Sequence, residues 1–254
     1  MTAALKSLVV PPSGGKAAHN ATVIFAHGLG DSGNGWSFLA DQLGGTFPYV
    51  KFIFPHAPTI PITLNGGYRM PAWFDLRTLR APVPGDPRGE EDEQGILESV
   101  KKLQYLVDEE VKAGIEQSRI VVGGFSQGAA IGLIFSLLTE SKASLCQVLR
   151  GLYNPMYLYV QLAGFICLSG WLPMDQKALR KPSSQDNRLF MGHGRKDPTV
   201  QYVWGEASYK VLKEKLKMPN VEFNTYSGLA HSADEQELND LALFLQKILP
   251  AKGK

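Results

Sequence analysis

The stretch that decides the fold reads Ile120-Val121-Val122-Gly123-Gly124-Phe125-Ser126-Gln127-Gly128-Ala129-Ala130-Ile131. An apolar, β-branched run leads into a Gly-x-Ser-x-Gly pentapeptide, and a second apolar run follows, an order that predicts strand, sharp turn and helix. The glycines on either side of Ser126 remove the Cβ atoms that would clash in so tight a bend. The stretch therefore predicts a serine nucleophile presented at the end of a buried strand.

Short apolar runs elsewhere predict the other strands of a sheet. With the run at 120–122, they lie at 23–26, 50–54, 163–168, 188–191 and 221–226. Apolar residues at helical spacing separate several of them, first at 96–111, before Gly114, and then at 133–138 and 238–249. This alternation predicts an α/β fold, a mostly parallel central sheet with helices on both faces. The segment 77–94, rich in proline, glycine and acidic residues, predicts a solvated surface loop.

Length and composition predict one α/β domain spanning 1–254. The formal net charge of +2 provides no basic field for nucleic acid, so we expect no such partner. Cys146 and Cys167 are too few for a disulfide framework, and no secretory signal opens the chain, so we expect a reducing, cytosolic setting. The uncharged stretch 151–174 contains prolines and amides and includes a strand-like run, so we do not interpret it as a membrane span.

A base and an acid for Ser126 should lie in loops that follow strands, in the chain order Ser, Asp or Glu, His. His231 follows the last predicted strand, and Asp197 follows the strand that ends near His193. We therefore predict Ser126, Asp197 and His231 as the catalytic triad, in which His231 moves the proton and Asp197 orients its ring. The rival pairs His193 with Asp175 or Asp186, but neither carboxylate immediately follows a convincing strand, so we expect His193 to be structural.

The first strong strand ends in His27-Gly28-Leu29-Gly30-Asp31, a glycine-rich turn like those that donate a backbone N–H to an oxyanion. We predict Leu29 as one donor and Gln127, at the start of the helix after the nucleophile, as the other. A nucleotide site is not supported, because the third glycine and the Walker lysine are missing. No zinc-type spacing of cysteine or histidine occurs, so we predict neither a metal nor a cofactor.

Together these segments resemble the acyl-protein thioesterases of the α/β-hydrolase fold. The resemblance covers most of the chain and rests on Phe25-Ala26-His27-Gly28-Leu29-Gly30-Asp31, Pro55-His56-Ala57-Pro58, Trp73-Phe74-Asp75, Gly123-Gly124-Phe125-Ser126-Gln127-Gly128, Leu168-Ser169-Gly170-Trp171-Leu172-Pro173, Gly192-His193-Gly194 with Asp197, and Tyr226 with His231-Ser232.

The resemblance implies a serine hydrolase that cleaves the thioester between a long fatty acyl chain and a protein cysteine through an acyl-serine intermediate. It implies S-acylated (palmitoylated) proteins as substrates, transient membrane contact, and a cytoplasmic location with the nucleus as a second compartment. The residues matching those that line or border an acyl channel are Leu29, Pro58, Thr59, Ile60, Leu64, Met70 and Trp73. The alternatives are a carboxylesterase or lysophospholipase acting on other acyl esters, and a catalytically inactive acyl-binding protein.

One segment departs from the family pattern. Residues 145–161 form an insert where a helix would ordinarily lead directly into a strand. Three interpretations compete: an extra surface hairpin or helix, an apolar flap that touches membrane or acyl chains, and non-coding sequence translated in error. We favour the third, because an exposed apolar segment promotes aggregation.

Overall fold

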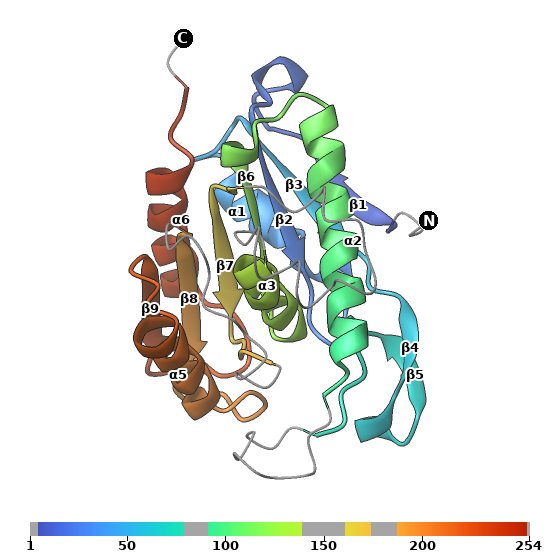
Figure 1. The fold of residues 1–254 in the computed structure, drawn as a ribbon. Coiled ribbons are helices and arrows are strands. Elements are labelled where there is room, and N and C mark those ends of the chain that lie inside the picture. Colours follow the sequence, from blue (N-terminus) through green and yellow to red (C-terminus); the bar gives the residue numbers. More distant parts are fainter. Residues whose placement is uncertain (1–4, 79–90, 139–160, 174–186, 253–254) are drawn as a thin grey trace.

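A seven-stranded sheet forms the frame of the computed structural model, which describes residues 5–78, 91–138, 161–173 and 187–252. The strands lie in the order β1-β3-β2-β6-β7-β8-β9, with β1 antiparallel to β3 and all other neighbours parallel (Figure 1). Their bounds are β1 Ser7–Val10, β2 Ala21–Ala26, β3 Val50–Pro55, β6 Ile120–Phe125, β7 Gly164–Leu168, β8 Leu189–Gly194 and β9 Val221–Tyr226. The prediction of a mostly parallel α/β sheet is confirmed.

Helices cover both faces of this sheet, as predicted. One face packs against α2 (Glu93–Lys112), α3 (Gln127–Leu138) and α5 (Tyr202–Lys210), and the other against α1 (Phe38–Leu43) and α6 (Glu235–Ile248). Successive side chains of a strand point to opposite faces, so β2 serves both cores. Its Ile24 and Ala26 belong to the core on the α2–α3 side, and its Val23 and Phe25 belong to the core on the α1–α6 side.

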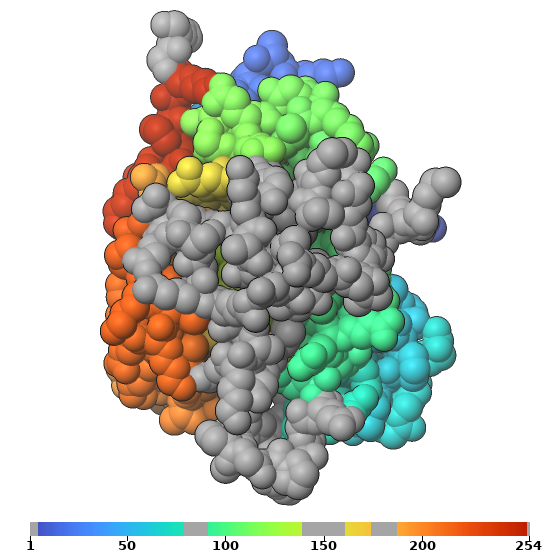
Figure 2. All heavy atoms as spheres, viewed as in Figure 1, coloured from blue at the N-terminus to red at the C-terminus, as the bar shows by residue number. Residues whose placement is uncertain are grey.

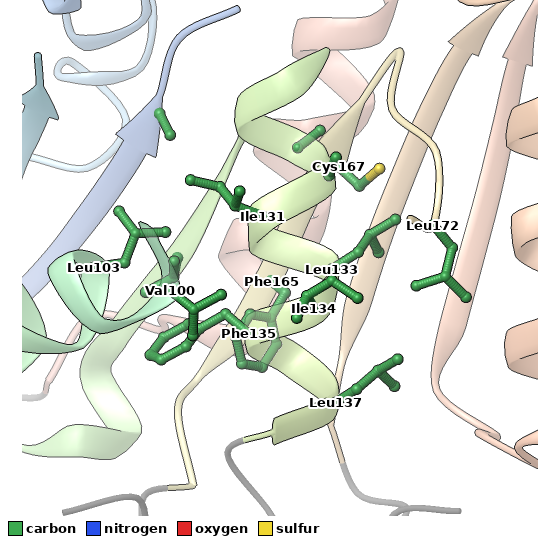
Figure 3. Close-up of a cluster of buried hydrophobic side chains, with 14 of the residues drawn as sticks. Val100, Leu103, Ile131, Leu133, Ile134, Phe135, Leu137, Phe165, Cys167 and Leu172 are labelled. Atoms are coloured by element: carbon green, nitrogen blue, oxygen red, sulfur yellow. The ribbon is translucent and has the colours of Figure 1, made fainter. Parts of the chain in front are cut away.

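Helix α3 is buried along its whole length, from Gln127 to Leu138. A helix that is apolar on all sides needs partners all around it. Figure 3 shows those partners, with the side chains of α3 meeting Val100 and Leu103 of α2 and Phe165 of β7. The helix that follows Ser126 is therefore held rigidly in the centre of the molecule.

The structure adds elements that the sequence patterns do not predict. The short edge strand β1 and the helices α1 and α5 are among them, and a two-stranded hairpin is formed by β4 (Thr59–Ile62) and β5 (Tyr68–Pro71). This hairpin lies at the molecular surface (cyan in Figure 2). Strands of four residues contain too few side chains for a clear alternation of polar and apolar positions.

The prediction of a surface loop over 77–94 is wrong at its C-terminal end. Helix α2 begins at Glu93, because the Asp92 side chain accepts a hydrogen bond from Gly95 N (3.0 Å) and so caps the helix. Residues 79–90 lie outside the described residues, as do 145–160 of the predicted insert. Within the described ranges, no helix combines the length and the apolar character required to span a membrane.

Candidate active site

Ser126 sits at the turn between β6 and α3 with a φ of 53°, in the left-handed region that side chains rarely adopt. A Cβ added to Gly124 or to Gly128 would overlap the carbonyl oxygen of Ala26, so the turn lies directly on the end of β2. Ser126 N donates to Leu168 O at 2.9 Å, which fixes the strained residue to β7. The two glycines are therefore required by close backbone approach, and the serine is held where the sheet ends.

The three residues predicted as a triad meet at this end of the sheet, from loops after β6, β8 and β9. Ser126 Oγ lies 3.0 Å from His231 Nε2, and His231 Nδ1 lies 2.7 Å from Asp197 Oδ2. Asp197 Oδ1 accepts from the backbone N–H groups of Thr199 (2.8 Å) and Val200 (2.9 Å). The side chain of Asp197 is fully buried, while that of His231 is 19% exposed. The arrangement is a continuous hydrogen-bonded chain from the buried carboxylate to the serine hydroxyl.

The partners of His231 determine which nitrogen carries its proton. An ionised carboxylate can only accept, so Nδ1 donates to Asp197 and Nε2 is left as the acceptor for the Ser126 hydroxyl. The ring of Phe125 packs against the imidazole with centroids 4.6 Å apart, and Trp36 packs against Phe125 in turn. This orientation suits His231 to take a proton from Ser126.

His193, the rival base, is placed differently. Its ring is buried, and its Nε2 donates to Val200 O (2.8 Å) while lying 3.7 Å from Asp197 Oδ2. Burial lowers the pKa of His193 and favours the neutral ring. His193 thus contacts the loop that presents Asp197, the geometry of a structural residue. Its suggested partners Asp175 and Asp186 lie outside the described residues.

The predicted oxyanion donors belong to two segments that meet at Ser126. A Cβ built on Gly28 would stand 3.4 Å from Ser126 Cβ, so the loop after β2 adjoins the nucleophile. Gly30 has a φ of 77°, and its N–H donates to Pro71 O (2.8 Å) at the end of β5. Gln127 is the first residue of α3, where the helix dipole favours negative charge. Both segments can therefore direct N–H groups to an oxyanion formed at Ser126.

The residues predicted to line an acyl channel lie on the β4–β5 hairpin, its flanks and the loop after β2. Leu29, Ile60 and Met70 are half-buried and pack against the same core, and Ile60 lies opposite Met70 in the hairpin. Leu64 is exposed, Thr59 is exposed and Pro58 is half-buried. Trp73 differs from the rest, because its ring is fully buried and its Nε1 donates to His27 O (2.7 Å). Trp73 therefore holds the loop that carries Leu29.

Two buried side chains near the site make hydrogen bonds that the sequence patterns do not predict. The side chain of Gln127 is hydrogen-bonded to the main chain of Trp73 and Phe74. His27 bonds Gly28 O through Nδ1 (2.7 Å) and accepts from Ala57 N at Nε2 (3.0 Å), and burial lowers its pKa. Among the described residues, no group of three or more His, Cys, Asp or Glu side chains could hold a metal ion.

A third buried group is Glu237 on α6. Its carboxyl is fully buried, and neither of its oxygens has a hydrogen-bond partner in the part of the chain that the structure describes. Burial, and then the charges of Asp234, Asp197 and Asp240, raise its pKa to about 8. It packs against Gly192, where a Cβ would overlap the carboxyl, just before the loop that carries Asp197. Glu237 is thus a neutral acid near pH 7.

The raised pKa of Glu237 predicts a pH-dependent stability. Between the unfolded value of 4.5 and about 8, the folded chain retains a proton that the unfolded chain has released. The free energy of unfolding therefore falls as pH rises through this window, by up to about 1.4 kcal/mol per pH unit. The stability associated with the neutral carboxyl is fully present below the window and is lost above it. Glu237→Gln should flatten this slope in urea unfolding between pH 5 and 9. The exposed Glu235→Gln, two residues away on the same helix, is the matched control; equal slopes in all three proteins would contradict the prediction.

Comparisons with known proteins place the chain among similar sequences and structures. A sequence profile described as phospholipase/carboxylesterase matches residues 9–151 and 149–249. Acyl-protein thioesterase 1 of Cryptococcus neoformans var. neoformans serotype D (strain JEC21 / ATCC MYA-565) is 41% identical, covering 98% of this chain and 100% of the relative. Acyl-protein thioesterase 1 of Yarrowia lipolytica is 39% identical, over 91% and 93%. The crystal structure of Zea mays acyl-protein thioesterase 2 is 30% identical, with a TM-score of 0.77 and coverage of 96% and 99%.

Proposed function

The chain belongs to the phospholipase/carboxylesterase family and is an acyl-protein thioesterase of the α/β-hydrolase fold, and we propose that it removes long-chain fatty acyl groups from protein cysteines through an acyl-serine on Ser126. The observation that carries the proposal is the hydrogen-bonded chain from Asp197 through His231 to Ser126. Its strained turn and buried carboxylate support a role for the serine as a nucleophile.

In the proposed reaction, Ser126 Oγ attacks the thioester carbonyl carbon while His231 Nε2 takes the hydroxyl proton. The oxyanion accepts hydrogen bonds from the N–H groups of Leu29 and Gln127. The C–S bond then breaks, and His231 returns the proton to the departing cysteine sulfur. Water, activated by the same imidazole, cleaves the acyl-serine ester and releases the fatty acid. Asp197 stabilises the imidazolium in both halves of the reaction.

The acyl chain would lie along the apolar surface formed by the loop after β2 and the β4–β5 hairpin. Leu29, Ile60 and Met70 supply half-buried apolar groups on these two segments. Pro58, Thr59, Leu64 and Trp73 would border this surface. The substrates would be S-acylated (palmitoylated) proteins, met through transient contact with a membrane. We expect the protein to act in the cytoplasm, with the nucleus as a second compartment.

Relative rates on three substrates test the proposed function. The value of kcat/KM on a palmitoylated cysteine peptide should exceed that on lysophosphatidylcholine. Hydrolysis of short aryl esters measures the basal activity of the triad. Ser126→Ala is the control for uncatalysed thioester exchange. Hydrolysis of esters with negligible turnover of the long-chain thioester would instead favour a carboxylesterase or lysophospholipase. Acyl binding without turnover of any substrate would favour an inactive binding protein.

A further inference from the structure

We propose that the side chain of Gln127 is a positioning residue for the oxyanion hole, which it joins to the segment that follows the β4–β5 hairpin. The inference rests on Ser126 as the nucleophile of the proposed function. It concerns the carboxamide of Gln127, whereas the direct contact with an oxyanion is assigned to the main-chain N–H of the same residue.

The carboxamide of Gln127 is fully buried and bridges the main chain of two consecutive residues. Its Oε1 accepts from Trp73 N (2.9 Å), and its Nε2 donates to Phe74 O (2.8 Å). These bonds join residues separated by 54 and 53 positions in the sequence. The first residue of α3 is thus attached to the 73–74 segment by an acceptor and a donor acting together.

The same segment also holds the other side of the oxyanion hole. Trp73 Nε1 donates to His27 O (2.7 Å), in the loop that carries Leu29, and Gly30 N in that loop donates to Pro71 O (2.8 Å). Ser99 Oγ of α2 donates to Trp73 O and anchors the segment from behind. The predicted donors Leu29 and Gln127 therefore share one support, the stretch from Pro71 to Phe74.

Only a neutral side chain with both a hydrogen-bond acceptor and a donor can bond Trp73 N and Phe74 O together. Methionine in place of Gln127 keeps the length of the side chain but leaves a buried N–H and a buried carbonyl without partners. A glutamate carboxylate accepts from Trp73 N but opposes Phe74 O, whereas a protonated glutamic acid can accept from one and donate to the other. A comparison of glutamine, methionine and glutamate at position 127 thus separates the effect of hydrogen bonding from the effect of side-chain volume.

The first test is hydrolysis of p-nitrophenyl acetate, which does not depend on a preference for long-chain thioesters. Gln127→Met should lower kcat by about 10- to 100-fold with a smaller change in KM, because misplaced donors weaken oxyanion stabilisation. Gln104→Met is the matched control: Gln104 is buried, and its Nε2 donates to Asp108 of its own helix, so the kcat of this variant should stay at the wild-type value. A lower Tm with unchanged kcat in Gln127→Met would overturn the proposal.

The second test uses Gln127→Glu and the pH profile. The ratio of its kcat to that of the wild type should rise as pH falls from 8.5 to 5.5, by about 10-fold or more, as the buried carboxyl takes up a proton and regains a donor. The same ratio for Gln127→Met should not change with pH, because methionine does not titrate. A flat ratio for Gln127→Glu would overturn the proposal.

Variants in the support itself keep the proposal testable if Gln127→Met does not fold. Ser99→Ala removes the bond to Trp73 O without touching the site, and Trp73→Phe removes the bond to His27 O. Each should lower kcat on p-nitrophenyl acetate by roughly 3- to 10-fold, and we expect the double variant to be non-additive because both act on one segment. Wild-type kcat in both single variants would overturn the proposal. Loss of thioester turnover alone, with these ester results intact, would count only against the proposed substrate.

Discussion

Ser126→Ala should abolish covalent labelling by a fluorophosphonate and lower kcat on every acyl substrate by on the order of 10⁴ to 10⁶. The reason is geometric. The turn between β6 and α3 presents one hydroxyl to His231 Nε2, at 3.0 Å, and alanine leaves the imidazole with no nucleophile to deprotonate. The backbone conformation at φ 53° should persist, because it is imposed by the packing of Gly124 and Gly128 on β2. Intact-protein mass spectrometry after labelling, together with steady-state rates, measures the effect.

Ser136→Ala is the matched control for this experiment. Ser136 is a buried serine on α3 whose hydroxyl bonds Leu133 O within the helix, so labelling and rate should stay at wild-type values. Labelling that persists in Ser126→Ala would show that another residue is the nucleophile.

Asp197→Asn should lower kcat by about 10⁴ while leaving the fold and substrate binding intact. Asparagine Oδ1 can keep both backbone bonds to Thr199 and Val200, which places its NH₂ group against His231 Nδ1. Two donors cannot pair, so the imidazole adopts the tautomer with its proton on Nε2. That nitrogen then faces Ser126 Oγ as a donor and cannot accept the hydroxyl proton.

The rate of a double variant distinguishes this mechanism from a general loss of stability. Combining Asp197→Asn with Ser126→Ala should cost no more than Ser126→Ala alone, because triad members act as a unit. Asp108→Asn, at a carboxylate on α2 that bonds Gln104, is the control and should retain full activity. Additive losses in the double variant, or a near-wild-type rate in Asp197→Asn, would contradict the assignment of Asp197.

The features that could be predicted are those with short-range causes. The alternation of apolar runs and helical spacing indicates the sheet and its covering helices, because burial on one face or two imposes a period on the chain. The Gly-x-Ser-x-Gly turn can be recognised from its glycines, since residues without a Cβ are needed at 124 and 128, where the backbone passes so close to Ala26. Chain order then relates Asp197 and His231 to the ends of strands. By contrast, β1 and the hairpin give too short a pattern to be recognised.

By itself, then, the sequence determined the α/β class, the serine turn and the strand-end loops in which its partners could lie, because these depend on residues near one another along the chain. Only the tertiary structure decided the distances from His231 to Ser126 and Asp197, the burial of Glu237 and the attachment of Gln127 to Trp73 and Phe74. Each of these depends on segments far apart in sequence that the folded sheet brings together. Such contacts leave no local period for a reader of the sequence to detect.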